Sequence, residues 1–368
     1  MMKKFGLSVA AAAFAATVAS GALAQDITIG VAGPFTGPNA SFGEQLKKGA
    51  EMAVKNINAA GGVLGRQLKI EFGDDASDPK QGVAVANQFA TKKVPFVLGH
   101  FNSSVSIPAS DVYGEEGIIQ ITPASTNPAL TDKAKFGNVF RVCGRDDQQG
   151  TVAGQYLAKT FAGKKVAVIH DKTSYGKGLA DETVKAMNAA GLKEAVYEGV
   201  TTGDKDFSAL VSKMKSANID AIYFGGLHNE AGLLVRQSRD QGLKAAFLSG
   251  DGIVSKEFWS ITGAAGEGVM MTFDPDPRKF PTAAKVVDQF KATGYDPEGY
   301  TLLSYSGVEV WAQAANLAKS LKKDDVAKAM KANKFQTVIG EIAYDAKGDL
   351  TVSKYVWYVW KNGEYSEM

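Results

Sequence analysis

The sequence predicts an α/β protein made of two doubly wound, parallel-sheet lobes. Apolar periodicity alternates between strand and helix in two successive runs, one before Arg141 and one after it. Several strands are short, continuous apolar runs, which is typical of parallel strands buried on both faces. Helices of roughly 10–15 residues separate them, as right-handed βαβ units require.

The first run opens with an alternating strand over 26–32 and a helix that ends at Gly61. A second strand is expected over 68–72. Asp78 and Pro79 then form an N-cap with proline at the first helical position, so a helix should begin there and continue to about residue 92. Two further buried strands are expected over 94–99 and 118–122.

The second run repeats this alternation after Arg141. Strands are expected over 165–170, 194–200, 221–225 and 245–249. Helices are expected between them over 179–190, 207–216 and 231–241. Each run is long enough for a sheet of its own, so 368 residues predict two lobes rather than one.

The first 24 residues have the pattern of a signal peptide. Lys3 and Lys4 precede an apolar stretch over 5–18, and small residues follow up to Ala24. We expect cleavage near Ala24 and an exported, periplasmic protein. An N-terminal membrane anchor is the alternative, but the apolar stretch is shorter than the ~20 residues that span a bilayer.

Composition excludes several classes of protein. Lys3 and Lys4 of the leader are two of the 41 basic residues, so 39 basic residues remain and match the 39 acidic ones. No basic stripe is therefore expected for a nucleic-acid partner. Cys143 is the single cysteine in the chain and cannot form an internal disulfide. Stability must therefore come from the two apolar cores.

Signatures of catalysis are poor in this sequence. The three histidines, His100, His170 and His228, have no metal-type spacing partners. No Gly-x-Ser-x-Gly nucleophile elbow occurs, and the glycines near Gly61 lie between a helix and a strand, the wrong order for a dinucleotide site. We expect a protein that is not an enzyme and that needs no metal and no cofactor.

Hydroxyl-rich loops instead follow the third and fourth strands, over 100–104 and 123–128. Open α/β sheets bind ligands at such strand ends, and loops that feed helix N-termini offer donors to an anion such as a carboxylate. Tyr175 and Asp251 lie at equivalent strand ends in the second run. A lone carboxylate there suits an ammonium group. Together these features predict a site for a zwitterion.

At these residues the sequence resembles the leucine/isoleucine/valine-binding proteins, type I periplasmic solute receptors of ABC transporters. The likeness extends over essentially the whole chain after the leader. The most telling stretches occur in the family's order, at 74–88, 121–128, 168–182, 203–210 and 345–350.

The resemblance implies how a ligand's main-chain groups are held. The α-carboxylate would be bound by Ser103 and by the Thr126 main chain. The α-ammonium would be shared by the Ala124 carbonyl, the Thr126 hydroxyl and the Asp251 carboxylate. Ser125 belongs to the same loop and is included in the expected site.

The resemblance also implies a side-chain pocket. Tyr175 would close over the ligand from the second lobe, while Phe42 and Tyr300 would line the pocket. Leu227 stands where a tyrosine often helps to close the cleft, and bulky Phe101 stands where a smaller aliphatic residue is usual. If Phe101 faces the ligand, branched side chains would overlap it at a cost of ~1–3 kcal/mol. Alanine, proline or γ-aminobutyrate would then be preferred; the alternative is that Phe101 only packs in the core.

Three crossover segments are implied between the lobes. They place residues 26–144 plus 274–353 in the first lobe and 145–273 plus 354–368 in the second. The expected function is capture of a free amino acid by hinge closure and its delivery to an inner-membrane ABC permease, with the receptor as a monomer. The alternative is a periplasmic amino-acid sensor that docks on a signalling receptor.

Overall fold

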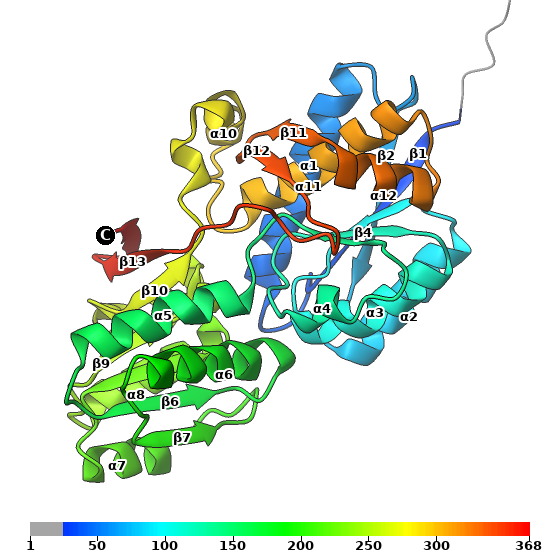
Figure 1. Cartoon of the computed structure of the whole chain (residues 1–368). Coiled ribbons are helices and arrows are strands. Elements are labelled where there is room, and N and C mark those ends of the chain that lie inside the picture. The colour runs from blue at the N-terminus through cyan, green and yellow to red at the C-terminus, as the bar shows by residue number, and fades with distance from the viewer. Residues whose placement is uncertain (1–24) are drawn as a thin grey trace, which may run out of the picture.

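The computed structural model describes residues 25–368, so the expected signal peptide lies outside the described residues. Two α/β lobes lie side by side and are joined by several connecting segments (Figure 1). Within the described residues, no helix is long and apolar enough to cross a membrane. The two-lobed α/β architecture expected from the sequence is confirmed.

The first lobe contains a five-stranded sheet in which all neighbouring strands are parallel, in the order β2-β1-β3-β4-β5. Its strands are β1 (Ile27–Gly33), β2 (Leu68–Asp74), β3 (Phe96–Leu98), β4 (Ile119–Thr122) and β5 (Val139–Arg141). Its helices are α1 (Ala40–Ala59), α2 (Pro79–Thr91), α3 (Ser103–Glu115), α4 (Ala129–Asp132), α10 (Ala284–Lys291), α11 (Thr301–Ala318) and α12 (Lys323–Ala332).

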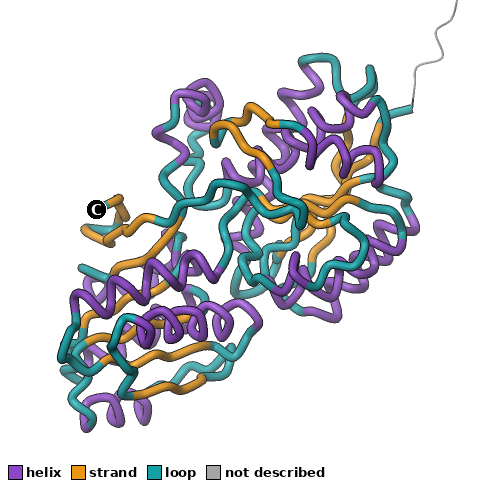
Figure 2. Tube along the Cα trace, viewed as in Figure 1, coloured by secondary structure: helices purple, strands orange, loops and turns teal. Residues whose placement is uncertain are grey.

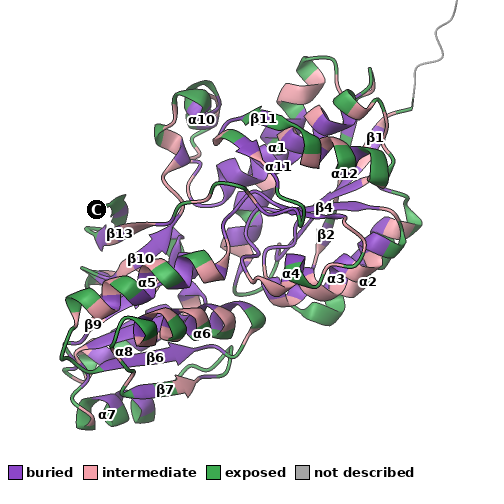
Figure 3. Ribbon diagram, in the orientation of Figure 1, coloured by how far each residue is buried: buried purple, intermediate pink, exposed green. Residues whose placement is uncertain are grey.

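Helices cover both faces of this sheet, and the strand pleat divides the core between them. Val31 belongs to the core under α1 and α11, whereas the next residue, Ala32, belongs to a separate core under α2 and α3. Successive side chains of a strand point to opposite faces, so a strand buried on both sides needs apolar or small residues throughout. The central strands of both sheets are accordingly buried over most of their length, whereas strands toward the sheet edges, such as β2, are partly exposed (Figure 3).

The second lobe contains a seven-stranded sheet in the order β14-β13-β10-β9-β8-β6-β7. Five strands form its parallel part: β6 (Val166–His170), β7 (Val196–Gly199), β8 (Ala221–Gly225), β9 (Ala246–Ser249) and β10 (Met270–Phe273). The covering helices are α5 (Asp146–Thr160), α6 (Ser174–Ala189), α7 (Ser208–Ser216), α8 (His228–Asp240) and α9 (Lys256–Thr262).

The second sheet is not wholly parallel, which corrects the expectation for this lobe. The chain returns to it at its C-terminal end as β13 (Val356–Lys361), antiparallel to β10, and β14 (Glu364–Glu367) pairs antiparallel with β13. The turn between them is Asn362-Gly363, and both residues have positive φ. That conformation forms the tight turn that joins two antiparallel strands.

The predicted start of α2 is confirmed, whereas the predicted start of α6 is wrong. The Asp78 carboxylate accepts a hydrogen bond of 2.8 Å from the Gln81 amide, and the helix begins at Pro79 as expected. The helix expected from residue 179 begins earlier, at Ser174, because the Thr173 hydroxyl accepts a hydrogen bond of 3.0 Å from the Gly176 amide.

The connecting segments between the lobes lie around Gly144, between β10 and α10, and before β13 (Figure 2). A buried ion-pair network holds two of them together. Arg141 Nε lies 2.8 Å from Asp349 Oδ1, and Arg145 Nη1 lies 2.6 Å from Asp349 Oδ2. Nearby, β11 (Lys334–Thr337) and β12 (Gly340–Ala343) form a small hairpin on the first lobe. The exact residues at which the chain changes lobes remain a prediction from the sequence.

Candidate functional site

A small cavity lies between the lobes, at the carboxyl ends of strands from both sheets. The nine residues that line it are Phe101, Asn102, Ser103, Ala124, Tyr175, Leu227, Asp251, Gly252 and Tyr300. Seven of these are among the ten residues expected from the sequence. This is the edge at which doubly wound sheets bind their ligands.

The first-lobe wall comes from the loops that follow β3 and β4. Ser103 is the first residue of α3, so the free amides of that helix terminus lie beside the cavity. The Ser103 hydroxyl accepts a hydrogen bond of 3.2 Å from the Asn127 amide, which ties the two loops together. The wall therefore offers donors that are held in place before any ligand arrives.

Internal hydrogen bonds fix the loop that carries Ala124. The Thr122 hydroxyl donates to the His100 carbonyl at 2.8 Å, and the Ser125 hydroxyl donates to the Phe101 carbonyl at 2.9 Å. Fully buried Arg141 donates to the Ser125 carbonyl and, at 2.7 Å, to the Asn127 carbonyl. Ser125 thus binds the two loops to each other, and its side chain does not line the cavity.

Thr126 is buried next to the cavity but is not among its lining residues. Its carbonyl accepts a hydrogen bond of 2.9 Å from the Asp146 amide at the start of α5. No hydrogen bond of normal geometry reaches its hydroxyl within residues 25–368, although the hydroxyl lies close enough to the Asp146 carboxyl group to oppose the rise of its pKa. A buried hydroxyl without a partner is costly, so Thr126 Oγ1 is a group that a bound ligand could satisfy.

Asp251 dominates the second-lobe wall. It follows β9, is 2% exposed, and begins a short 3₁₀ helix, η1 (Asp251–Ile253). The Tyr175 hydroxyl donates to Asp251 Oδ1 at 2.7 Å and accepts from the Gly252 amide at 2.9 Å. The Tyr300 hydroxyl, from the first lobe, donates to Asp251 Oδ2 at 2.8 Å.

Burial raises the pKa of Asp251, and the hydrogen bonds from Tyr175 and Tyr300 oppose that effect only in part. Burial, reinforced by the Asp251 charge, also raises the pKa of both tyrosines, so both phenols remain protonated donors. No cation faces Asp251 in the residues that line the cavity. The carboxyl group is therefore suited to receive a positive charge from a ligand.

Aromatic rings limit the width of the cavity. The Phe101 ring stacks on Phe42 with centroids 4.4 Å apart and contacts Tyr300 edge to face at 5.1 Å. Phe42 lies behind Phe101 and does not line the cavity itself. The volume left in the cavity is only about 10 Å³, which is room for one water. The walls must move apart for any amino acid to enter.

Two further acids, fully buried Asp146 and partly buried Asp274, feel the charge of Asp251 and are not among the residues expected from the sequence. Burial raises the pKa of Asp146 well above its usual value, and burial together with the Asp251 charge raises the pKa of Asp274 to about 8. Both lie in or beside connecting segments. Within the part of the chain that the structure describes, no group of three acidic, histidine or cysteine side chains could hold a metal ion.

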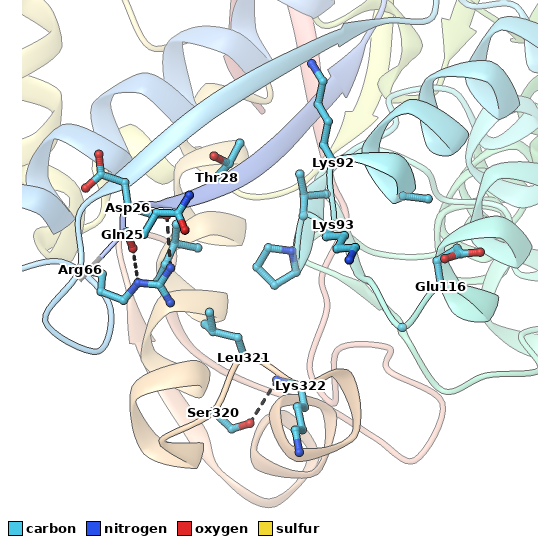
Figure 4. Close-up of a pocket in the computed structure, with 15 residues that line it drawn as sticks. Gln25, Asp26, Thr28, Arg66, Lys92, Lys93, Glu116, Ser320, Leu321 and Lys322 are labelled. Carbon is cyan, nitrogen blue, oxygen red and sulfur yellow. Dashed lines mark hydrogen bonds between the residues drawn. The ribbon is translucent and has the colours of Figure 1, made fainter. Parts of the chain in front are cut away.

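A larger but shallow depression of about 770 Å³ lies at the opposite edge of the first sheet, where β1 to β3 begin (Figure 4). The Arg66 guanidinium donates hydrogen bonds there to the carbonyls of Gln25 and Asp26. The Ser320 hydroxyl accepts a hydrogen bond from the Lys322 amide at 3.1 Å. The polar groups of this depression do not converge on a common point, whereas those of the smaller cavity converge around Asp251. The smaller cavity is therefore the candidate site.

Known proteins resemble this chain over nearly its full length. A family profile described as "Periplasmic binding protein" matches residues 26–364. "Leu/Ile/Val-binding protein homolog 1" of Brucella suis is 56% identical over 353 residues, which cover 95% of each chain. The chain belongs to the Leu/Ile/Val-binding protein family of type I periplasmic binding proteins.

Other relatives match this chain in sequence or in fold. "Amino acid binding protein" of Pseudomonas aeruginosa is 52% identical, covering 93% of this chain and 92% of its own. The crystal structure of the leucine-binding protein LivK of Thermotoga maritima superposes with a TM-score of 0.86 at 29% identity, covering 93% of this chain and 97% of its own. LivJ of Streptococcus pneumoniae was solved in complex with isoleucine. It superposes with a TM-score of 0.84 at 28% identity, covering 93% of this chain and 99% of its own.

Membership of the Leu/Ile/Val-binding protein family confirms the expectation that the chain is a solute-binding protein and not an enzyme. The fold also brings the expected site residues of both lobes to one place. Phe101, Ser103, Ala124, Tyr175, Leu227, Asp251 and Tyr300 line the cavity, whereas Phe42, Ser125 and Thr126 lie behind its walls. Their roles toward a ligand stay predictions.

Proposed function

We propose that this family member is the periplasmic substrate-binding protein of an ABC importer and captures a free amino acid between its lobes. The supporting observation is the buried Asp251 carboxylate, which faces hydroxyl and amide donors of the opposite lobe across one cavity. Acid on one wall and anion donors on the other match the ammonium and carboxylate of a zwitterion.

The ligand's carboxylate is placed against the Ser103 hydroxyl and the amides at the start of α3 and around Thr126. Its ammonium is placed between Asp251, the Ala124 carbonyl and the Thr126 hydroxyl. Thr126 Oγ1 is buried without a partner, which fits this role. Tyr175 closes the site from the second lobe.

Closure is proposed to be a rotation about the three connecting segments, which divide the chain into 26–144 plus 274–353 and 145–273 plus 354–368. The cavity has too little room to admit an amino acid without such movement. Burial of the ligand then favours the closed state, and the closed surface is the one that the permease recognises. The receptor acts as a monomer.

The ligand is proposed to be small or slender. LivJ was solved with isoleucine, and the Brucella suis relative carries a Leu/Ile/Val-binding name. In this chain Phe101 and Tyr300 both line the cavity and contact each other. We assign alanine, proline or γ-aminobutyrate as preferred over leucine, because a branched side chain would overlap these rings at a cost of about 1–3 kcal/mol.

Uptake of radiolabelled amino acids by cells tests the transport function. Deletion of the gene should abolish uptake of the preferred amino acid, and expression of the full chain, leader included, should restore it. The Asp251→Asn variant should restore little uptake at low substrate concentration. Unchanged uptake in the deletion strain would contradict the importer assignment and favour a periplasmic sensor. Retention of the full-length precursor in the cytoplasm would contradict cleavage near Ala24 and export.

A further inference from the structure

A second cavity, of about 190 Å³, lies at the hinge rather than in the cleft. Its lining includes residues of each region where the chain passes between lobes: Val142, then Asp274 and Pro275, then Ser353 and Lys354. The first lobe closes the remainder with Pro277, Phe280, Leu303, Ile339, Glu341, Ile342, Leu350 and Val352. The cavity is smaller than the about 300–1,000 Å³ typical of drug-sized ligands, so it suits a small molecule.

Most of the lining is apolar, and Asp274 is a partly buried acid among it. Asp274 projects from a segment stiffened by Pro275 and Pro277, and its carbonyl accepts a hydrogen bond of 2.7 Å from the Tyr358 hydroxyl. No side chain among residues 25–368 forms a hydrogen bond or ion pair with its carboxyl group. Glu341, on the rim, is already paired with Lys334 at 2.8 Å, and Lys354 is exposed.

We propose that this hinge cavity binds a short-chain primary alkylammonium ion, with the ammonium on Asp274 and the alkyl chain against Leu303 and Ile342. A mostly apolar pocket with one unpaired carboxyl group recognises a molecule with one cationic end and one hydrocarbon end. A site of this kind is distinct from the proposed amino-acid site at Asp251, which faces the cleft, and it is independent of which amino acid binds there.

Binding of an ammonium ion at Asp274 should release a proton, which can be measured. With a pKa of about 8, Asp274 is largely protonated at neutral pH, so an ammonium ion that binds its carboxylate releases a proton. The titratable or charged groups around it are Asp251, Cys143, Glu341, Lys354, Tyr355 and Tyr358. At high pH the carboxylate is already ionised, and proton release should disappear.

Calorimetric titration of the mature protein with n-butylammonium tests the proposal, with 1-butanol as the uncharged control. We expect saturable binding of the amine, weaker binding of the alcohol by about tenfold or more, and proton release at pH 7 measured in two buffers of different ionisation enthalpy. Asp274→Asn should lower amine affinity by about tenfold or more. Ile339→Trp should fill the cavity and abolish binding without touching the charge.

The Asp251→Asn variant separates the two sites. Amine binding at the hinge should be retained or strengthened in that variant, because the amine does not contact Asp251 and loss of the Asp251 charge lowers the pKa of Asp274. Three results would overturn the proposal: no saturable binding of the amine, equal binding of amine and alcohol, or an affinity that Asp274→Asn leaves unchanged. Loss of amine binding in Asp251→Asn alone would place the amine in the cleft and would also overturn it.

Discussion

The Tyr300 hydroxyl donates a hydrogen bond of 2.8 Å to Oδ2 of Asp251 and thereby joins the two lobes across the cavity. Tyr300 precedes α11 in the first lobe, whereas Asp251 follows β9 in the second. The other carboxylate oxygen accepts from Tyr175. Asp251 is therefore the group on which both walls of the proposed site converge, and its charge should control ligand binding.

Replacement of Asp251 by Asn should lower affinity for the preferred amino acid by about 10- to 100-fold, because a hydrogen bond to a charged group is worth about 1.5–3 kcal/mol. Tyr300→Phe keeps the ring and the carboxylate and should lower affinity by no more than about fivefold. Calorimetric titration measures both. Equal losses in the two variants would show that Asp251 acts through the interlobe hydrogen bond and not through the ligand.

Affinity should rise with pH in the acid range. Burial raises the pKa of Asp251 in the free protein, and a bound ammonium favours the ionised form, so binding releases a proton. Affinity should therefore increase as pH rises above about 4, the ordinary carboxyl value, until Asp251 is ionised in the free protein as well. Titrations at a series of pH values measure this, and the dependence should vanish in Asp251→Asn. An affinity that falls with rising pH would contradict the assignment.

Replacement of Asp349 by Ala should lower the free energy of unfolding by about 3–5 kcal/mol, because it leaves the buried guanidinium of Arg141 without its counter-ion. The matched control is Asp132→Ala, which removes a half-exposed partner of Arg145 and should cost about 1 kcal/mol or less. Urea denaturation monitored by tryptophan fluorescence compares them. Equal losses would show that the Arg141 pair is not the effective contact.

The same carboxylate predicts an acid limit to stability. Burial would raise the pKa of Asp349, but Arg141, Arg145 and Thr131 outweigh it and hold the pKa below the usual value. The contribution of Asp349 is thus present above the ordinary carboxyl pKa of about 3.9 and is lost as pH falls through the lower pKa of the folded state. Acid unfolding of Asp349→Asn should accordingly depend less on pH below about 4 than that of wild type.

Replacement of Phe101 by Leu should increase affinity for leucine about tenfold, because it removes the ring that meets Tyr300 at 5.1 Å and widens the cavity. Affinity for alanine should stay the same or fall. Competition of leucine against the preferred ligand measures the change. No gain for leucine would show that Phe101 packs in the core without selecting the ligand.

Local signals in the sequence were sufficient for most of the fold. The strand over 221–225 was predicted to the residue, and the Asp78-Pro79 cap located the start of α2. The C-terminal hairpin was missed, although aromatic alternation after Tyr355 followed by Asn362-Gly363 is a strong hairpin signal. Its two strands follow one another with no helix between them, so they lie outside the strand–helix alternation that indicates parallel sheets.

The candidate site could be predicted only in part. Loops after strand ends identified Ser103 and Ala124, but spacing cannot tell which of several consecutive loop side chains faces inward; Ser125 turns away to bind the Phe101 carbonyl. Asp146 and Asp274 could not be identified in the same way, because their low exposure and raised pKa arise where segments distant in sequence meet near the hinge. No local pattern reports such burial.

Calorimetric titration tests most directly whether the cleft binds a free amino acid. The mature protein is unfolded in urea, refolded to remove carried ligand, and titrated with leucine, isoleucine, valine, alanine, proline and γ-aminobutyrate. We predict micromolar or tighter binding of at least one small ligand, with leucine about tenfold or more weaker, as overlap with Phe101 and Tyr300 requires. Leucine binding as tight as that of any small ligand would contradict the narrowed pocket, and no binding of any amino acid would contradict the account as a whole.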